Sequence, residues 1–155
     1  MYIADATYLT FTAELASGYL EKIRVTTTAK VVKEAIHNAA SETARAEIRK
    51  HVEIIKSERP ALDKNFRNLS FEDKELLQTV VRYKDECLLI TDDGLLKIAA
   101  EKQRVKVFST PGFIVHLTKN NKIEKSNALN WLEGLKRKYP RQKLLAKKIE
   151  KIKNR

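Results

Sequence analysis

The sequence predicts an α/β protein in which helices enclose a central parallel sheet. From residue 1 to residue 108, short segments that are apolar on both faces alternate with segments whose apolar residues recur at helical spacing. Strands that are apolar on both faces are typical of parallel sheets covered by helices on each side. After residue 108 only the helical spacing continues. We therefore expect a three-layer αβα sandwich followed by a helical extension.

The first 60 residues predict two strands and several helices. Short apolar or β-branched runs favour the strands, and apolar residues spaced three or four apart favour the helices. Proline ends a helix because it lacks an N–H group and its ring clashes with the preceding turn. The expected elements are a strand at 2–6 leading into a helix through Leu15, a strand at 24–28, a helix beginning at Ala29, and a polar helix from Ser41 to Ser57 that Pro60 ends.

Residues 70–108 repeat the alternation. Ser70 followed by Asp73 is a helix-start signature, because the hydroxyl accepts a backbone N–H and an acid suits the first turn. The expected elements are a helix beginning at Ser70, a strand at 87–90, a helix after Gly94 with Leu95, Leu96, Ile98 and Ala99 inward, and a strand at 105–108. The extension predicts helices at 111–117 and 126–138 and a last one after Pro140 with Leu145, Ile149 and Ile152 inward.

The composition favours an intracellular protein. A length of 155 residues suits one core, at about 100–200 residues per domain. The single cysteine, Cys87, excludes an internal disulfide and a multi-cysteine zinc site. The first residues lack the basic and apolar regions of a signal peptide, and no apolar run approaches the ~20 residues of a membrane helix. We expect a cytoplasmic location and no membrane partner.

The positive charge is concentrated in the C-terminal part. Residues 1–118 hold 18 basic and 17 acidic side chains, whereas residues 119–155 hold 13 basic and 3 acidic ones. We therefore expect a domain at 1–118 and a basic helical extension at 119–155. Such an extension is either a solvated helical surface or a segment that binds phosphates by counterion release. The residues expected to contact RNA are Lys136, Arg137, Lys138, Arg141, Lys143, Lys147 and Lys148.

Several acids follow predicted buried strands. Asp5 ends the first strand, and Asp92 and Asp93 end the strand at 87–90. An ionised carboxylate beside buried residues is costly unless it is paired, hydrogen-bonded or bound to a metal. Ligand crevices of parallel sheets lie beyond the carboxyl ends of the strands, so two acids meet there if the strands are neighbours. Asp73 and Glu34, in the helices nearby, could lean over the same edge.

Two interpretations of these acids remain open. Taken singly, Asp5 and Asp93 suit helix caps, Asp73 a helix start, and Glu34 a solvated surface. Taken together, they form a cluster of hard oxygen ligands that repels itself until a cation such as Mg²⁺ or Mn²⁺ neutralises it. Such ions activate water for in-line displacement at phosphorus. The acids and the basic extension together suggest hydrolysis of phosphodiester bonds.

The ordered set of these motifs, Ile3-Ala4-Asp5-Ala6, Val31-Val32-Lys33-Glu34, Leu69-Ser70-Phe71-Glu72-Asp73 and Ile90-Thr91-Asp92-Asp93, resembles the PIN domains, which are metal-dependent ribonucleases. The resemblance covers about residues 1–115. It implies a three-layer fold, a Mg²⁺ or Mn²⁺ site made by Asp5, Glu34, Asp73 and Asp93 as the catalytic acids, and Thr91 as an orienting residue. Asp92 is a second acid at that corner, so the metal ligand is either Asp92 or Asp93.

Within that family, the motifs are most similar to the archaeal ribosome-assembly endonucleases. Those proteins carry a zinc ribbon after the PIN domain, whereas this chain has one cysteine and a basic extension instead. The leading expectation is a metal-dependent endoribonuclease acting on rRNA or mRNA. The alternatives are a non-catalytic RNA-binding or ribosome-associated module, and a toxin ribonuclease that pairs with an antitoxin. The resemblance further implies a homodimer.

Overall fold

The structure is a computed structural model that describes residues 1–57, 59 and 66–155. It divides into two compact units, Met1–Phe108 and Ser109–Arg155. The boundary expected after residue 118 lies inside a helix, α7 (Thr110–Lys119). Since residues 109–118 contain no Lys, Arg, Asp or Glu, the second unit holds the same 13 basic and 3 acidic side chains as the expected extension.

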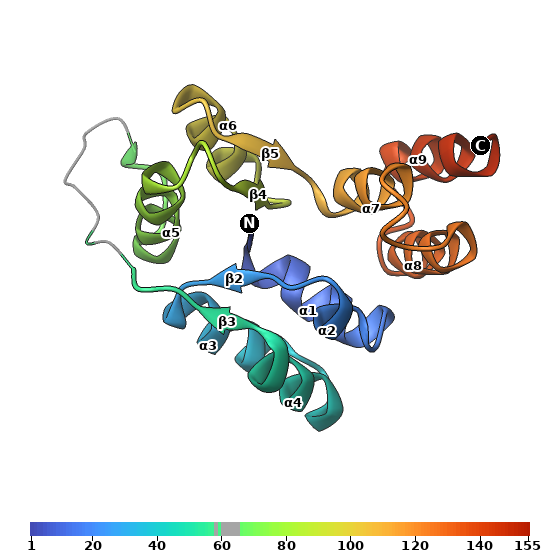
Figure 1. Cartoon of the computed structure of the whole chain (residues 1–155), viewed down its shortest axis with the longest axis horizontal. Helices are drawn as coiled ribbons and strands as arrows, with labels where there is room; N and C mark the ends of the chain where they lie inside the picture. Colours follow the sequence, from blue (N-terminus) through green and yellow to red (C-terminus); the bar gives the residue numbers. More distant parts are fainter. Residues whose placement is uncertain (58, 60–65) are drawn as a thin grey trace. The chain divides into compact units, whose positions relative to one another are not determined.

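The first unit contains an all-parallel sheet, which confirms the predicted α/β class (Figure 1). In the described part of the chain the sheet has five strands in the order β3-β2-β1-β4-β5. The strands are β1 (Tyr2–Ala4), β2 (Thr26–Thr27), β3 (Glu53–Ile54), β4 (Leu88–Ile90) and β5 (Lys106–Phe108). The central strands β1 and β4 are buried almost throughout, as expected for strands covered on both faces.

Helices form a layer on each side of this sheet. The chain runs from β1 outward to β3, then returns past β1 to β4 and β5. Because parallel crossovers are right-handed, the helices of these two runs lie on opposite faces. Accordingly, the early helices contact one another, and α5 contacts α6. The helices are α1 (Ala6–Leu15), α2 (Tyr19–Lys22), α3 (Ala29–Asn38) and α4 (Glu42–His51) in one layer, and α5 (Phe71–Arg82) and α6 (Gly94–Lys102) in the other.

The helix predicted to run from Ser41 to Ser57 is shorter, so that prediction was wrong in its second half. Helix α4 ends at His51, and the backbone then pairs with β2 as the short strand β3. The N–H of Glu53 donates to the Val25 carbonyl at 3.2 Å, and the N–H of Ile55 donates to the Thr27 carbonyl at 2.9 Å. Pro60, the expected helix breaker, lies outside the described residues.

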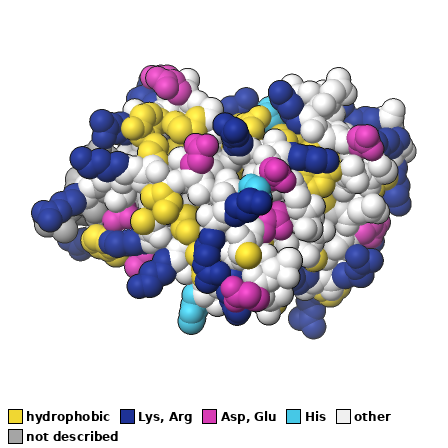
Figure 2. Space-filling model, turned by 60° about the horizontal axis from the view of Figure 1, so that its bottom comes forward, with side chains coloured by type: hydrophobic (Ala, Val, Ile, Leu, Met, Phe, Trp, Pro, Cys, Tyr) yellow, Lys and Arg dark blue, Asp and Glu magenta, His cyan; other side chains and the backbone are white. Residues whose placement is uncertain are grey.

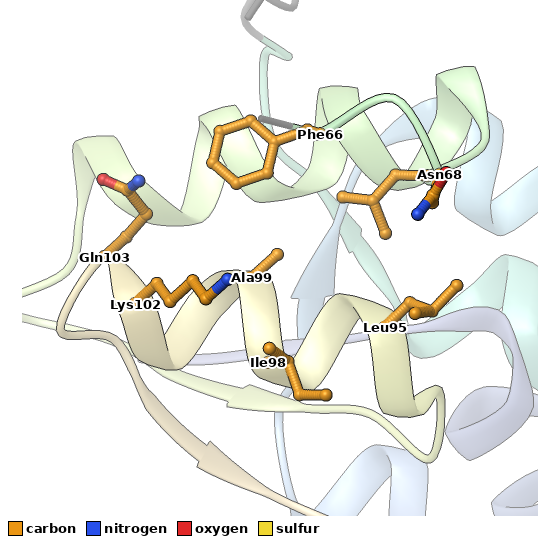
Figure 3. A pocket seen from close by; sticks show the side chains of 8 residues that line it. Phe66, Asn68, Leu95, Ile98, Ala99, Lys102 and Gln103 are labelled. Carbon is orange, nitrogen blue, oxygen red and sulfur yellow. The ribbon is translucent and has the colours of Figure 1, made fainter. Parts of the chain in front are cut away.

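The inward face predicted for α6 was also wrong in part. Leu96 and Ala99 are buried, but Leu95 and Ile98 are 52% and 53% exposed. Four apolar residues within five positions wrap around a helix, so only the stripe at i, i+3 and i+4 reaches the sheet. Leu95 and Ile98 instead line a hollow of about 310 Å³, together with Phe66 and Asn68 (Figure 3).

The second unit is entirely helical, as predicted. It consists of α7, α8 (Lys125–Lys138) and α9 (Lys143–Lys153), and each of these helices contacts the other two. Leu145, Ile149 and Ile152 are buried on α9, which confirms its predicted inward face. No helix among the described residues has the length and apolar character needed to cross a membrane.

Candidate functional site

The strand order places two acid-bearing chain segments side by side. The chain leaves β1 toward one edge of the sheet and re-enters on the other side of β1 at β4, so the crevice between these strands is the switch point where ligands bind in parallel α/β sheets. Strands β1 and β4 pair in parallel with Ala4 opposite Ile90, and the Asp5 N–H donates to the Ile90 carbonyl at 3.0 Å. Asp5 and residues 91–93 therefore share one carboxyl edge.

Asp5 is buried at this edge and uses both carboxylate oxygens. Its Oδ1 accepts the Tyr8 N–H at 2.9 Å and so caps α1, as one interpretation of the sequence expected. Its Oδ2 accepts the Thr91 hydroxyl at 2.6 Å and the Asp92 N–H at 3.1 Å. Asp5 is only 7% exposed. These bonds fix the orientation of the carboxylate.

The environment of Asp5 disfavours its charge. Burial raises the pKa of Asp5 to about 6, against the lowering effect of the bonds from Thr91 and Tyr8. The negative charge of Asp92 adds to the rise. A carboxyl that is both buried and beside another acid is typical of functional sites, where a bound cation restores the ionised form.

Thr91 connects the two strand ends. The buried Thr91 hydroxyl donates to Asp5 and accepts the Asp93 N–H at 3.1 Å. Asp93 Oδ1 accepts the Leu96 N–H at 2.7 Å, so Asp93 also serves as the N-cap of α6. The resemblance gave Thr91 an orienting role, and the structure places its hydroxyl between Asp5 and the backbone of Asp93.

Glu34 and Asp73 lie on helices that contact each other, α3 and α5. Burial raises the pKa of Asp73, and the charges of Asp93 and Glu72 raise it further. Burial also raises the pKa of Glu34, together with the charges of Asp73 and Glu72. Asp73 therefore lies close enough to Glu34 and to Asp93 for their charges to repel its own.

Glu72 is an acid that the sequence analysis missed. Its charge raises the pKa of both Glu34 and Asp73, so it belongs to the same electronegative region. The signal available in the sequence was its position beside Asp73 in the first turn after Ser70, which leaves its side chain at the same end of α5. The resemblance implied only the later acid of that turn, Asp73, as a ligand.

The carboxylates of this region are suitable ligands for a hard divalent cation. Within the described residues, no group of three or more His, Cys, Asp or Glu is arranged closely enough to hold a metal ion. Carboxylate oxygens are nevertheless the ligands that Mg²⁺ and Mn²⁺ prefer. In the same part of the chain, no Lys or Arg contributes to the pKa shifts of Asp5, Glu34 or Asp73. The charges that raise the pKa values of these three groups are those of neighbouring acids.

Lys30, which lies one helical turn before Glu34 on α3, is engaged with residues of α5. Lys30 Nζ forms an ion pair with the buried Glu75 at 3.0 Å and lies 3.8 Å from the centre of the Phe71 ring. A lysine held by a carboxylate and an aromatic face has little freedom to swing toward other acids. The Lys30–Glu75 pair therefore joins α3 to α5 without neutralising Glu34 or Asp73.

The basic residues predicted to contact RNA lie on the second unit. Lys136, Arg137 and Lys138 form the last turn of α8 and are exposed. Of the others, Arg141, Lys143 and Lys147 are exposed and Lys148 is half-buried. Figure 2 shows one face of the molecule, on which Lys and Arg side chains stand among fewer Asp and Glu side chains. The structure thus leaves these cations available to solvent.

No family model matches the chain, and no curated protein matches its sequence significantly.

Proposed function

We propose that this protein is a metal-dependent endoribonuclease of the PIN class. The observation that carries the proposal is the acidic region at the switch point, where the buried Asp5 is held by Thr91 beside Asp92 and Asp93. The repulsion of Glu34, Asp73 and Asp93 extends this region onto the neighbouring helices. A concentration of carboxylates at this position suits binding of Mg²⁺ or Mn²⁺ followed by RNA phosphate.

In this proposal Asp5, Glu34, Asp73 and one of Asp92 and Asp93 hold the cation. The cation would supply a nucleophilic water and would stabilise charge on the phosphate. The chain itself contributes orientation, because Thr91 fixes the Asp5 carboxylate and the Asp93 backbone. The mutual repulsion of the acids also favours binding of a cation. The basic side chains of the second unit would hold the RNA backbone by counterion release.

Cleavage of RNA by the purified protein tests the proposal. With Mn²⁺ present, we expect a fluorescent RNA to be cut, and we expect the cutting to stop with chelator. Asp5→Asn preserves the size of the side chain and should abolish cleavage, because its amide is a poor ligand for a hard cation. Asp85→Asn, the same change at an exposed acid, is the matched control and should cleave like the parent. Cleavage that persists in Asp5→Asn or in chelator would contradict the proposal.

A non-catalytic RNA-binding module is the second candidate. The observation that favours it is the absence, among the described residues, of a group of three ligands already in place for a metal ion. The charge of the second unit, 13 basic against 3 acidic side chains, would then be the functional feature. This candidate predicts salt-sensitive RNA binding that leaves the RNA intact at every Mn²⁺ concentration.

A further inference from the structure

The second unit contains a basic cleft that the sequence analysis did not identify. The cleft has a volume of about 410 Å³ and lies between the end of α7, the following loop and the end of the chain. Its charged lining residues are four cations and one acid, namely Lys119, Lys122, Lys125, Arg155 and Glu124. All four cations are exposed to solvent. The charge of the lining is therefore strongly positive.

Two further cations of α9, Lys148 and Lys151, add to the positive charge near Lys119. Lys151 lies near enough to Lys119 for the charges of the two ammonium groups to repel each other. The charges of Lys151 and Arg155 lower the pKa of Lys119, and Lys148 adds to this effect. Like charges held this close are unfavourable, so the folded chain gathers them at some cost in stability.

Helix ends account for only part of this arrangement. Cations near a helix C-terminus are favourable because the last carbonyls carry about half a negative charge. Lys125 meets this requirement directly, since its Nζ donates to the Lys153 carbonyl at 2.9 Å. Glu150 forms an ion pair with Lys153 at 3.9 Å and so compensates the charge of that lysine. Lys119, Lys151 and Arg155 together carry three positive charges, which is more than the partial negative charges at the ends of α7 and α9 can balance.

From this geometry we infer that the cleft lined by Lys119, Lys122, Lys125 and Arg155, together with Lys151 beside Lys119, binds successive phosphates of an RNA backbone. This inference rests on the proposed function in that RNA is the ligand, and it assigns where the RNA is held. The charge of the cleft favours a polyanion. The lysines that line the cleft are exposed to solvent, and a phosphate placed between Lys119 and Lys151 would relieve their repulsion.

Binding of a fluorescent single-stranded RNA by the full chain, followed by anisotropy in chelator, tests the inference without turnover. The test variant is Lys119→Gln/Lys151→Gln. Loss of two phosphate contacts should weaken binding on the order of tenfold at physiological salt and should lower the slope of log affinity against log salt by about 1.4. Lys119→Arg/Lys151→Arg keeps the charge and should restore binding.

Two control variants locate the effect. Lys50→Gln/Lys84→Gln removes the same charge from exposed positions of the first unit and should leave the affinity within about twofold, because neither lysine lines the cleft and surface charges outside it are screened by salt. Lys136→Gln/Lys138→Gln removes two of the cations predicted from the sequence. If that pair weakens binding while Lys119→Gln/Lys151→Gln does not, the cleft is not the phosphate site.

Thermal unfolding separates loss of binding from loss of fold. Removal of mutually repelling ammonium groups should leave the midpoint of Lys119→Gln/Lys151→Gln equal to or above that of the parent. Absence of RNA binding by the parent, or preference for phosphatidylserine vesicles over RNA, would overturn the inference. RNA held in the cleft but never cut with Mn²⁺ would instead contradict the proposed nuclease and leave the inference intact.

Discussion

The two carboxylate oxygens of Asp5 have separate partners. Oδ1 accepts the first-turn N–H of Tyr8, whereas Oδ2 accepts the hydroxyl of Thr91 and the N–H of Asp92. The first bond begins α1, and the other two join β1 to the end of β4. Since Asp5 is buried, its ionisation affects the free energy of unfolding as well as any ligand bound at the edge.

The pKa of Asp5 predicts a pH dependence of stability in the absence of metal. The pKa of Asp5 is about 6 in the folded chain, against an ordinary value of 3.8. Because it is raised on folding, the stability that Asp5 contributes is complete below pH 3.8 and is lost as the pH rises through about 6. The loss amounts to about 3 kcal/mol. Urea unfolding of the parent and of Asp5→Asn, from pH 4 to pH 7 with chelator, measures it.

Only the difference between these two proteins tests that prediction, since other groups titrate in both. The free energy of unfolding of the parent minus that of Asp5→Asn should fall as the pH rises from 4 to 7. A difference that stays flat or rises over this range would contradict the raised pKa of Asp5.

The Thr91 hydroxyl predicts a second effect at this scale. Thr91→Val keeps the shape of the side chain but removes the donor to Asp5 and the acceptor for the Asp93 N–H. Leaving these buried or half-buried groups unpaired should cost about 1–3 kcal/mol in the free energy of unfolding. Thr91→Ser retains the hydroxyl and should cost less than Thr91→Val. Equal losses in the two variants would contradict this prediction, because they would show that the methyl group contributes as much as the hydroxyl.

At the scale of elements, α6 shows what determines the buried face of a helix that has apolar residues on several sides. Leu96 and Ala100 are fully buried, whereas Leu95 and Ile98 are about half exposed. The Asp93 cap starts the helix at Gly94 and so fixes which stripe faces the sheet. A cap can therefore decide the buried face where the apolar pattern alone is ambiguous.

This register predicts unequal effects of two similar substitutions in α6. Leu96→Ala should lower the free energy of unfolding by about 2–5 kcal/mol, because it leaves a cavity in the core. Leu95→Ala should change it by less than about 1 kcal/mol, since the side chain already meets solvent. Denaturant unfolding of both variants measures the contrast. Similar losses would mean that both leucines are buried.

Local patterns predicted most elements, and their failures have physical causes. The capping signature of Ser70 and the apolar run of β4 depend on neighbours in sequence, so both were predictable. Strand β3 was missed because it has two exposed residues and forms only by pairing with β2. The edge shared by Asp5 and residues 91–93 was predicted on the condition that their strands are neighbours, a condition that the strand order meets. The closeness of Lys119 and Lys151 depends on tertiary packing and gave no local signal.

At the scale of the whole molecule, the net charge of +11 is divided between two regions of opposite character. The first unit is nearly neutral but holds the acidic region at its switch point, whereas the second unit holds almost all of the excess positive charge. A polyanion can approach the acids only when their charge is compensated. The proposed cation would therefore affect both the stability of the first unit and its access to RNA.

Metal addition and removal test this coupling directly. Mn²⁺ should stabilise the folded chain by about 2.7 kcal/mol at a concentration 100 times its dissociation constant, because it binds the folded acids and not the unfolded chain. The midpoint of thermal unfolding should rise accordingly. Chelator should reverse the rise. Asp5→Asn should lose it, and Asp85→Asn should keep it. An equal rise in Asp5→Asn would place the bound ion away from the proposed site.

The short outer strands of the sheet affect the tendency of this chain to aggregate at high concentration. An unpaired strand edge is a template for pairing with another chain, the step from which amyloid-like stacking grows. Here β3 offers two residues, one of them the charged Glu53, and β5 offers three, beginning with the exposed Lys106. Charged, brief edges of this kind disfavour growth of the sheet from one copy into the next.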